Sequence, residues 1–565
     1  MLTEPYFHNG AAGIPFAKNA YMKKLFLYAA LLMNMFAACQ TSSDGDGDES
    51  SEKKKNVSKR DYSITKANSY SDLFLDSMTM ESFITKNNIA DSLARRMRSF
   101  YNTRNYQYAW FTSNGLTEQA RGFWNLHDYV TTYANDTTLK NKALQKKMDG
   151  LVMEESLSVS ASNKEMLNTE LTLTQHFLLY MLGNYEKGYV KRKEMERFIP
   201  RKKEDPLYLA DSLVNKKHKD DKYYDDVNEV YGALKEQLRL YTDIVKAGGW
   251  PTVEIKAKSL KKGTSSPAVS VIKKRLWISK DLPVNDTSQV FNDTLELAVK
   301  NFQERHGYKP DGVIGANVIK EMNVPAKIRL EQILLNLERM RWMPTTMAKQ
   351  GNMILVNIPE FVLHMYENGR KVWDMVVVVG KEGNNTMMFN GDLSTVVFSP
   401  YWNVPPSIVR GEIMPALSRN PGYLEGQNME QTGTEGGLPV IRQRPGPGNA
   451  LGKVKFLFPN SFNIYFHDTP SKSLFARDKR AFSHGCIRLA EPEKMANYVL
   501  RNQPEWTPER INEAMNAGTE KHVKVKNPIP VIITYYTAWV DETGKLNFRE
   551  DIYSHDKKIL AKMFR

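Results

Sequence analysis

The chain has 565 residues, of which 41% are hydrophobic and 25% are charged, as in ordinary globular proteins. This length exceeds what one hydrophobic core can organise, and it predicts about three to four domains. Lys+Arg number 78 against 64 Asp+Glu, and the net charge of +14 favours an anionic partner: nucleic acid, anionic lipid or a polyanionic polymer. Two cysteines are too few for a disulfide framework or a zinc finger, and no P-loop or dinucleotide glycine fingerprint is present.

An apolar run near the N-terminus predicts export. A basic pair at 23–24 precedes the fourteen-residue run Leu25–Ala38, which is too short to span a bilayer but suits a signal-peptide core. Its ending, Phe-Ala-Ala-Cys, resembles a bacterial lipobox, which implies that Cys39 is lipidated and becomes the mature N-terminus. An ordinary secretory signal with an incidental cysteine is the alternative. We expect residues 1–39 to be a signal and lipobox region, with Met22 as the start and the remainder exported and membrane-anchored.

The next stretch predicts a tether and then a helical domain. Residues 40–60 are mainly Ser, Asp, Gly, Glu and Lys, which bury too little apolar surface to fold and therefore predict a flexible tether. Within 61–250, segments such as 89–97 and 233–240 place apolar residues at three-and-four spacing. We therefore expect a helical scaffold domain that ends at the Gly-Gly-Trp-Pro sequence of 248–251.

Two patterns in this helical domain each have two interpretations. The aromatic stretch 101–110 is compatible with a sugar-stacking surface, but packed helix junctions are the favoured interpretation. The segment 187–222 is dense in Lys and Arg. A solvated face explains it most simply, and an electrostatic hold on an anionic polymer is the alternative.

A compact unit follows at 266–323, where the apolar spacing predicts three short helices joined by glycine turns. Its sequences Ala-Val-Lys-Asn-Phe-Gln and Asp-Gly-Val-Ile-Gly occur in the order found in the peptidoglycan-binding three-helix domain, which the unit resembles. The resemblance implies glycan binding, although such modules also persist as packing elements. A linker at 328–350 is predicted to contain an amphipathic helix from Ile328 to Trp342.

From residue 351 the pattern changes to strands and predicts a mostly β domain over 351–535. Asn368-Gly369 between two apolar runs indicates a hairpin. An insertion at 407–452, rich in Gly, Pro, Asn and Glu, has the composition of a lid or binding loop, and 536–565 is a C-terminal extension. The expected fold is thus α+β and multidomain. The predicted strands are 353–358, 361–366, 372–380, 396–398, 462–466 and 531–534.

The stretch His467–Leu489 contains the second cysteine, Cys486, with two histidines within nineteen positions. A free thiol is mostly protonated at neutral pH, so a nucleophilic cysteine needs a base. We assign that role to His467, expected at a sheet edge just after the strand 462–466. His484 is too close along the chain to align for proton transfer, and it is expected to form the pocket wall. Backbone N–H groups of His484, Gly485 and Cys486 are candidates for an oxyanion hole, with Gly485 allowing close approach of the substrate.

The spacing of His467, Ser483, His484, Gly485 and Cys486 resembles the L,D-transpeptidase signature, in which a histidine precedes Ser/Thr-His-Gly-Cys by 14–17 residues. Two further segments, Val-Asn-Ile-Pro at 356–359 and Pro-Tyr-Trp-Asn-Val-Pro at 400–405, match the large branch of that family. That branch has a helical scaffold, a peptidoglycan-binding insertion and a loop that caps the active site. The resemblance covers about residues 65–535.

The resemblance implies roles for further residues. Arg488, where many members have Asn, would grip a carboxylate of the substrate. Trp402 and Tyr401 would line the stem-peptide groove, with burial in the barrel-like core as the alternative. Ser483 is expected to hydrogen-bond the turn and Asp468 to orient the strand end, or either to position His467.

The implied reaction is attack of the Cys486 thiolate on the third residue of a peptidoglycan tetrapeptide stem, with a thioester and then a 3→3 cross-link. It implies donor and acceptor stems as partners, no nucleic acid, no cofactor and no metal, since the spacing of His467, His484 and Cys486 suits zinc poorly. The location implied is the bacterial envelope, facing the periplasm from a lipid anchor. An L,D-carboxypeptidase and a non-enzymatic wall-tethering lipoprotein stay as alternatives.

Overall fold

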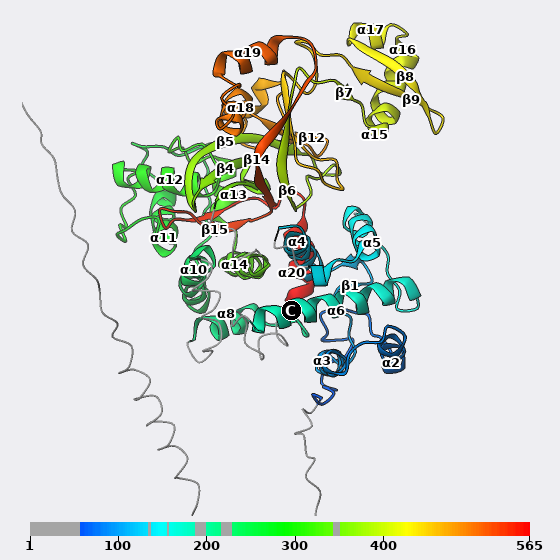
Figure 1. Ribbon diagram of the computed structural model, residues 1–565. Coiled ribbons are helices and arrows are strands. Elements are labelled where there is room, and N and C mark those ends of the chain that lie inside the picture. Colours follow the sequence, from blue (N-terminus) through cyan, green and yellow to red (C-terminus); the bar gives the residue numbers. More distant parts are fainter. Residues whose placement is uncertain are drawn as a thin grey trace, which may run out of the picture. The chain divides into compact units, whose positions relative to one another are not determined.

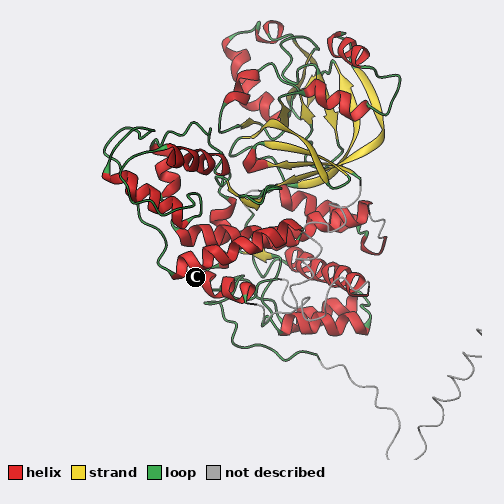
Figure 2. Ribbon diagram, turned by 90° about the vertical axis from the view of Figure 1, so that its left-hand side faces the viewer, coloured by secondary structure: helices red, strands yellow, loops and turns green. Residues whose placement is uncertain are grey.

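The computed structural model describes residues 57–133, 137–154, 157–186, 199–215, 229–342 and 351–564. Cys39, the signal region, most of the tether, much of the basic segment 187–222 and the end of the predicted linker lie outside these ranges. Residues from Val57 onward belong to one compact unit. No helix in the described part of the chain is both long and apolar enough to cross a membrane. The fold is α+β and multidomain, as expected: one part is mostly helical, and the other combines the large sheet with further helices (Figures 1 and 2).

The N-terminal helices share one aromatic core. Tyr101, Tyr108 and Trp110 are completely buried there, so the aromatic stretch is a packing element and the favoured interpretation is confirmed. The helices of this region are α2 (Ser77–Lys86), α3 (Asp91–Asn102), α4 (Glu118–Tyr133), α5 (Lys142–Met153), α6 (Lys164–Glu186), α8 (Pro206–Val214) and α10 (Glu229–Lys246), with the two-residue strands β1 (Phe111–Thr112) and β2 (Gly115–Leu116).

The expected three-helix unit is present as α11 (Pro267–Ile278), α12 (Asp293–Arg305) and α13 (Ala316–Met322), around a small core of its own. Local sequence explains where two of these helices start. Ser266 caps α11 by accepting from the N–H of Ala268, and Asn292 caps α12 by accepting from that of Leu295.

The linker helix α14 (Ala326–Arg341) differs from its prediction, because it is buried on all sides and not on one face. Its polar side chains stay inside because neighbouring elements supply partners for them. Gln332 donates to the carbonyls of Thr537 and Arg549, and Asn336 bonds the Thr537 hydroxyl. Hydropathy spacing cannot show such partners, because they lie about 200 positions away in the sequence.

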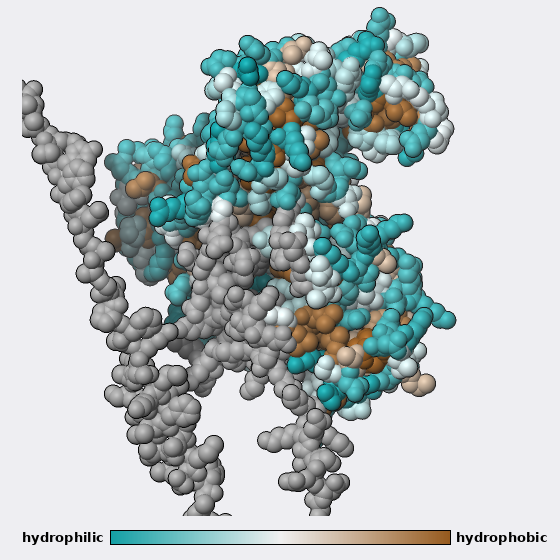
Figure 3. Space-filling model, in the orientation of Figure 1, coloured by the Kyte–Doolittle hydropathy of each residue, from teal (hydrophilic) through white to brown (hydrophobic). Residues whose placement is uncertain are grey.

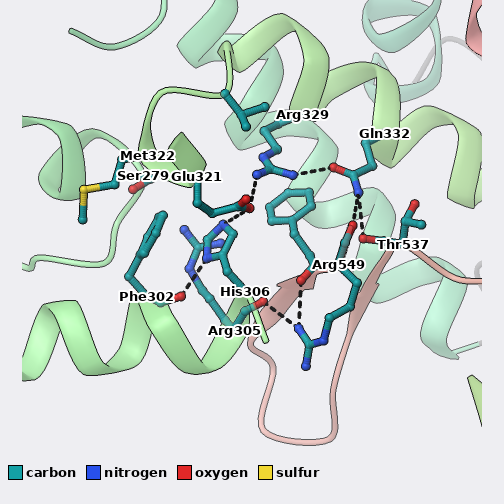
Figure 4. A network of polar contacts seen from close by, with 12 residues as sticks. Ser279, Phe302, Arg305, His306, Glu321, Met322, Arg329, Gln332, Thr537 and Arg549 are labelled. Atoms are coloured by element: carbon teal, nitrogen blue, oxygen red, sulfur yellow. Dashed lines mark hydrogen bonds and ion pairs between the residues drawn. The ribbon is translucent and has the colours of Figure 1, made fainter. Parts of the chain in front are cut away.

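Polar contacts also fix the three-helix unit to α14 and to the C-terminal segment, as Figure 4 shows. Arg329 of α14 pairs with Glu321, and Arg549 donates to the carbonyl of Arg305 at 3.0 Å. The ring of His306 stacks on Phe302 with 3.9 Å between centroids and faces Phe548 at 5.6 Å.

The C-terminal residues complete the helical core. The hairpin of β15 (Ala538–Val540) and β16 (Leu546–Phe548) and the helix α20 (His555–Met563) contribute side chains to the same cluster as the N-terminal helices. Arg339 of α14 joins the parts, with its Nε 2.9 Å from Glu118 of α4 and its Nη1 2.7 Å from Asp556 of α20. All three side chains are more than 90% buried.

We expect Arg339→Ala to lower the free energy of unfolding by about 3–5 kcal/mol, because it leaves two buried carboxylates without their cation. Urea unfolding followed by circular dichroism measures the change. Arg95→Ala is the matched control, since Arg95 is exposed on α3 and should change stability by less than about 0.5 kcal/mol. Equal effects of the two substitutions would show that the buried ion pair does not hold these parts together.

The C-terminal β region is a nine-stranded sheet in the order β12-β5-β13-β11-β10-β6-β14-β3-β4, and the additional pairing of β4 with β5 closes it into a barrel. Asn368 and Gly369 form the predicted hairpin turn, both with positive φ. The helices α18 (Pro492–Leu500) and α19 (Pro508–Asn516) pack against the barrel core. The strands are β3 (Asn352–Asn357), β4 (Val362–Glu367), β5 (Arg370–Gly380), β6 (Phe389–Phe398), β10 (Val454–Leu457), β11 (Phe466–His467), β12 (Ala481–Ser483), β13 (Ile487–Leu489) and β14 (Lys521–Thr534).

The predicted insertion is a small subdomain with its own core, which we call the cap, residues 402–443. It begins at Trp402, earlier than expected, because that residue pairs with β9 and packs on cap residues. Figure 3 shows apolar side chains gathered within it, at the upper right of the view. Its elements are β7 (Trp402–Asn403), α15 (Pro406–Ile408), the π-helical turn η3 (Val409–Ile413), α16 (Met414–Arg419), α17 (Tyr423–Gly426), β8 (Met429–Glu435) and β9 (Leu438–Gln443).

Candidate active site

His467 lies on β11, and Cys486 immediately precedes the neighbouring strand β13, in the middle of the sheet. β11 and β13 are parallel, with Phe466 opposite Ile487 and His467 opposite Arg488. Phe466 and Ile487 are completely buried in the barrel core. Because side chains alternate along a strand, His467 and Arg488 share the opposite face, and the next alternating positions, Tyr465 and Cys486, are on it too.

Two sequence expectations for this strand are wrong. The strand was predicted at 462–466, but it is Phe466–His467, because Asn460 and a left-handed Asn463 hold the preceding residues in a turn. His467 also does not stand at a sheet edge, since β11 has β10 on one side and β13 on the other. The interior position fixes the imidazole more firmly than an edge would.

The hydrogen bond of His467 sets its tautomer. Its Nδ1 lies 2.5 Å from the backbone oxygen of Asp468, and a carbonyl can only accept, so Nδ1 carries the proton. Nε2 is therefore the basic nitrogen. Burial, together with the charge of Arg488, lowers the pKa of His467 to about 3, so the imidazole is neutral at physiological pH. It is the carbonyl of Asp468, and neither the Ser483 hydroxyl nor the Asp468 carboxylate, that positions His467.

The Cys486 thiol rests as a neutral group. It is half-buried, and its Sγ lies 3.7 Å from the carbonyl oxygen of Asn463. Burial raises the pKa of Cys486 to about 11, while hydrogen bonding to the backbone N–H and hydroxyl of Tyr465 and the charge of Arg488 act in the opposite direction. The Cys486 thiol and the His467 imidazole are therefore both neutral at physiological pH.

Tyr465 is a site residue that the sequence analysis missed. Its ring meets the His467 imidazole edge-on at 5.8 Å between centroids. Burial raises the pKa of Tyr465, and the charge of the Cys486 thiol and a hydrogen bond to it raise that pKa further. The alternation of a strand, applied backward from His467, would have found it.

The turn before the thiol is tightly held. The Ser483 hydroxyl donates to the carbonyl of Cys486 and accepts from the N–H of Gly485 at 3.2 Å, as expected of a turn hydrogen bonder. Thr386 donates to the Gly485 carbonyl at 2.7 Å. Gly485 has φ of 114°, a conformation that side-chain-bearing residues avoid. This backbone conformation explains why a glycine occupies the position better than the expected close approach of the substrate does.

This turn changes the expected oxyanion hole. The N–H of Gly485 is engaged by Ser483, so it is not a donor for a substrate oxygen. The N–H groups of His484 and Cys486 have no acceptor among the described residues. They are the remaining backbone candidates for holding an oxyanion.

A row of cations crosses the sheet beside these residues. Lys455 of β10 stands opposite His467, which itself stands opposite Arg488. Arg488 is partly buried, and its Nε has no hydrogen-bond partner within the described chain. A buried guanidinium without an acceptor suits an anionic group of a ligand.

The aromatic pair Tyr401 and Trp402, at the start of the cap, takes two different positions. Trp402 is half-buried and packs on the core of the cap, and it is not part of the barrel core. Tyr401 lies under Arg442 at 4.3 Å, and its carbonyl accepts from Lys455 at 3.2 Å. Of the two, Tyr401 is therefore the one connected to the row that contains His467.

His484 connects the catalytic turn to the cap. Its Nε2 lies 2.9 Å from the carboxylate of Glu412, which belongs to η3 of the cap. His484 and Glu412 are 72 positions apart in the sequence, and both side chains are partly exposed, at 35% and 55%. The contact holds the cap against the residues that flank Cys486.

For the acyl-enzyme that the sequence resemblance implies, we expect Glu412→Gln to raise the share lost to water about two- to fivefold, because an exposed ion pair contributes up to about 1 kcal/mol to holding the cap in place. The ratio of hydrolysed to transferred product, measured by mass spectrometry, checks this. Glu425→Gln, an exposed cap residue on α17 without an ion pair, is the matched control. An unchanged ratio in Glu412→Gln would mean that this contact does not govern water access.

Comparison with known proteins adds to this geometry. Residues 351–533 match the family model described as the L,D-transpeptidase catalytic domain, YkuD. The chain carries a catalytic domain of the L,D-transpeptidase family. Residues 95–238 match the model of the scaffold domain, and residues 265–322 that of the "putative peptidoglycan binding domain".

One curated relative of this chain is a "putative L,D-transpeptidase" of Haemophilus influenzae, 31% identical over 256 residues. The match covers 42% of this chain and 50% of the relative, so the chain spans about half the length of the curated relative it matches.

Solved L,D-transpeptidases were also found. That of Xylanimonas cellulosilytica is 13% identical, with a TM-score of 0.16 and coverage of 50% of this chain and 99% of the other. That of Stackebrandtia nassauensis is 13% identical, with a TM-score of 0.19 and coverage of 50% and 96%. Scores this low carry no argument about shared structure, and the assignment rests on the sequence matches.

Proposed function

We propose that the protein is an L,D-transpeptidase that forms 3→3 cross-links in peptidoglycan through a thioester on Cys486. The observation that carries this proposal is the placement of His467 on β11 and of Cys486 immediately before the adjacent parallel strand β13, in a region that matches the model of that family. A thiol and a neutral imidazole in this arrangement are a nucleophile and its base.

In the first half of the reaction His467 Nε2 takes the thiol proton while Sγ attacks the carbonyl carbon of the third stem residue. Backbone N–H groups of His484 and Cys486 hold the negative oxygen of the tetrahedral intermediate. The bond to the fourth residue, a D-alanine, then breaks, and the imidazolium returns the proton to the departing amine. A thioester of the stem on Cys486 is left.

In the second half an amine of the acceptor stem attacks the thioester carbonyl and gives its proton to His467. A new amide bond forms, the carbon–sulfur bond breaks, and the thiolate recovers the proton from the imidazolium. Arg488 would hold a carboxylate of the donor stem throughout, because its buried Nε lacks a partner.

The other parts of the chain would bring this site to its substrate. The three-helix unit would contact the peptidoglycan glycan, and its fixed contacts with α14 would keep it at a constant place relative to the barrel. Lipidation at Cys39 would anchor the protein to a membrane of the bacterial envelope, facing the periplasm. The peptidoglycan stems are then the donor and acceptor, and the reaction needs no cofactor or metal.

The test is incubation of the protein with disaccharide-tetrapeptide, followed by mass spectrometry of products and of intact protein. Dimer that has lost one D-alanine, together with an acyl adduct at Cys486, is the expected result. Tripeptide without dimer would identify an L,D-carboxypeptidase instead. Absence of any adduct at Cys486 would contradict both the transpeptidase and the carboxypeptidase activity, and it would favour a wall-tethering role.

A further inference from the structure

A bond from outside the catalytic turn sets the direction of one candidate oxyanion donor. Thr386, which lies between β5 and β6, donates its hydroxyl to the carbonyl of Gly485 at 2.7 Å. Because a peptide group is planar and trans, the carbonyl of Gly485 and the N–H of Cys486 point in opposite directions. The bond from Thr386 therefore fixes the direction of the Cys486 N–H.

The second candidate donor is oriented from the same loop. The N–H of His484 shares its peptide group with the carbonyl of Ser483, and that carbonyl accepts from the N–H of Lys381 at 2.9 Å. Lys381 begins the loop that ends at Thr386. The two ends of one loop, residues 381–386, thus orient both backbone N–H groups that are candidates for holding an oxyanion.

The loop is folded tightly on the end of β5. The N–H of Gly380 donates to the Thr386 hydroxyl oxygen at 2.9 Å, and the N–H of Asn384 donates to the carbonyl of Lys381 at 2.9 Å. A Cβ at Gly380 would lie 2.1 Å from the backbone oxygen of Asn384 and 2.8 Å from the nitrogen of Thr386. A side chain at this position would therefore push the loop away from the catalytic turn.

Tyr553 of the C-terminal extension holds both ends of this fold together. Its hydroxyl donates to the carbonyl of Gly380 at 2.7 Å and accepts from the N–H of Thr386 at 3.2 Å. Carbonyl oxygens only accept and backbone N–H groups only donate, so the positions of the two hydroxyl protons, on Tyr553 and on Thr386, are determined. Tyr553 and Thr386 are both buried.

The position of Tyr553 is itself fixed by its neighbours. The hydroxyl of Tyr535 accepts from the N–H of Tyr553 at 3.0 Å, and the two rings stack at 5.6 Å between centroids. Tyr553 belongs to the barrel core, although it lies beyond residues 351–533 that match the catalytic-domain model. Asp556, three positions later, pairs with Arg339 of α14. One short segment thus connects the helical core with the loop beside Cys486.

We propose that Tyr553 is a positioning residue of the active site. Through Gly380 and Thr386 it orients the N–H groups of His484 and Cys486 toward the oxyanion that forms when the thiol attacks a carbonyl. Loss of its hydroxyl would leave a buried carbonyl and a buried N–H unpaired, and the loop would shift to satisfy them. This inference rests on the nucleophilic role of Cys486 proposed above, and it does not depend on which acyl group the thiol receives.

The test compares two reactions of the Cys486 thiol that differ in whether an oxyanion forms. With p-nitrophenyl acetate the thiolate adds to the ester carbonyl, an oxyanion forms, and p-nitrophenolate leaves. With iodoacetamide the thiolate displaces iodide from a methylene carbon, and no oxyanion forms. Both rates are measured on the full-length protein by mass spectrometry of the peptide that contains Cys486, which separates it from Cys39.

We expect Thr386→Val to slow acylation by p-nitrophenyl acetate about 10- to 30-fold and Tyr553→Phe about three- to tenfold, since a misdirected donor loses part of the 10²–10³-fold that an oxyanion donor contributes. Alkylation by iodoacetamide should stay within about twofold of the wild type in both variants, because this reaction does not use the oxyanion hole. Circular dichroism establishes that each variant is folded.

Two further variants serve as controls. Thr386→Ser keeps the hydroxyl and should acylate within about threefold of the wild type. Tyr498→Phe removes another tyrosine hydroxyl of the barrel region, one that donates to Glu367 at 2.5 Å, and should change neither rate by more than about twofold.

Equal slowing of acylation and alkylation in Thr386→Val and Tyr553→Phe would overturn the inference, because it would indicate general distortion of the turn. Acylation at the wild-type rate in both variants would overturn it as well. Failure of the proposed function would look different: the wild type would then be acylated by p-nitrophenyl acetate and not by disaccharide-tetrapeptide, and the selective effect of the two substitutions would remain.

Discussion

Replacing Cys486 with alanine should abolish acylation, with turnover at least about 10⁴-fold below that of the wild type. The second cysteine of the chain, Cys39, lies in the predicted signal region, so the folded domain has no other thiol to substitute. The expected observation is an intact-protein mass without an acyl adduct after incubation with disaccharide-tetrapeptide, under conditions in which the wild type is fully labelled. Residual turnover within tenfold of the wild type would show that another group attacks the stem.

The control for this change is stability. Cys486 is half-buried, and its thiol makes weak contacts with the Asn463 carbonyl at 3.7 Å and with Tyr465, so its loss should leave the unfolding midpoint nearly unchanged. Cys486→Ser keeps the shape and adds a second check. Its hydroxyl, with a higher pKa than a thiol, should also fail to acylate at a measurable rate, because nothing at the site lowers the pKa of even the thiol below its ordinary value.

The sequence was sufficient to predict those elements that depend on residues close to one another in the chain. The Ser-His-Gly-Cys turn, the Asn368-Gly369 hairpin and the three-helix unit all follow from residues close to one another in the chain, because turn chemistry and side-chain alternation act over a few positions. The roles predicted for Cys486 and His467 rest on the same local stretch and stay predictions. Tyr465 was missed although alternation places it beside them.

What the sequence could not show depends on contacts between distant segments. The burial of α14 on all sides rests on partners such as Thr537 and Glu118, each about 200 positions away. The pairing of Glu412 with His484 is likewise a product of tertiary packing. Hydropathy patterns record which residues prefer burial, and they carry no information on which distant polar group meets which.

Replacing His467 with alanine should slow acylation by about 10²–10⁴-fold without abolishing it, because the residual thiolate can still attack without a base. The remaining rate should rise about tenfold for each pH unit between 6 and 9, as the thiolate fraction does below the pKa of the thiol. His467→Ala acylating at the wild-type rate would contradict its assignment, and His484→Ala is the comparison variant. His484 pairs with the exposed Glu412 carboxylate, so its loss should act on the cap and leave the wild-type pH profile in place.

The pH profile of the wild type follows from the buried imidazole. His467 must be neutral to accept the thiol proton, and burial lowers its pKa to about 3, so acylation should persist as the pH falls from 7 to 5 and decline only toward pH 3. An ordinary histidine would already lose activity below pH 6.5. The unfolded chain binds this proton near pH 6.5 and the folded chain only near 3, so stability decreases as pH falls through that window. Acylation rates measured from pH 4 to 8, with circular dichroism at each pH, distinguish the two effects: an acidic limb centred near 6.5 in a fully folded protein would show that His467 is not the base.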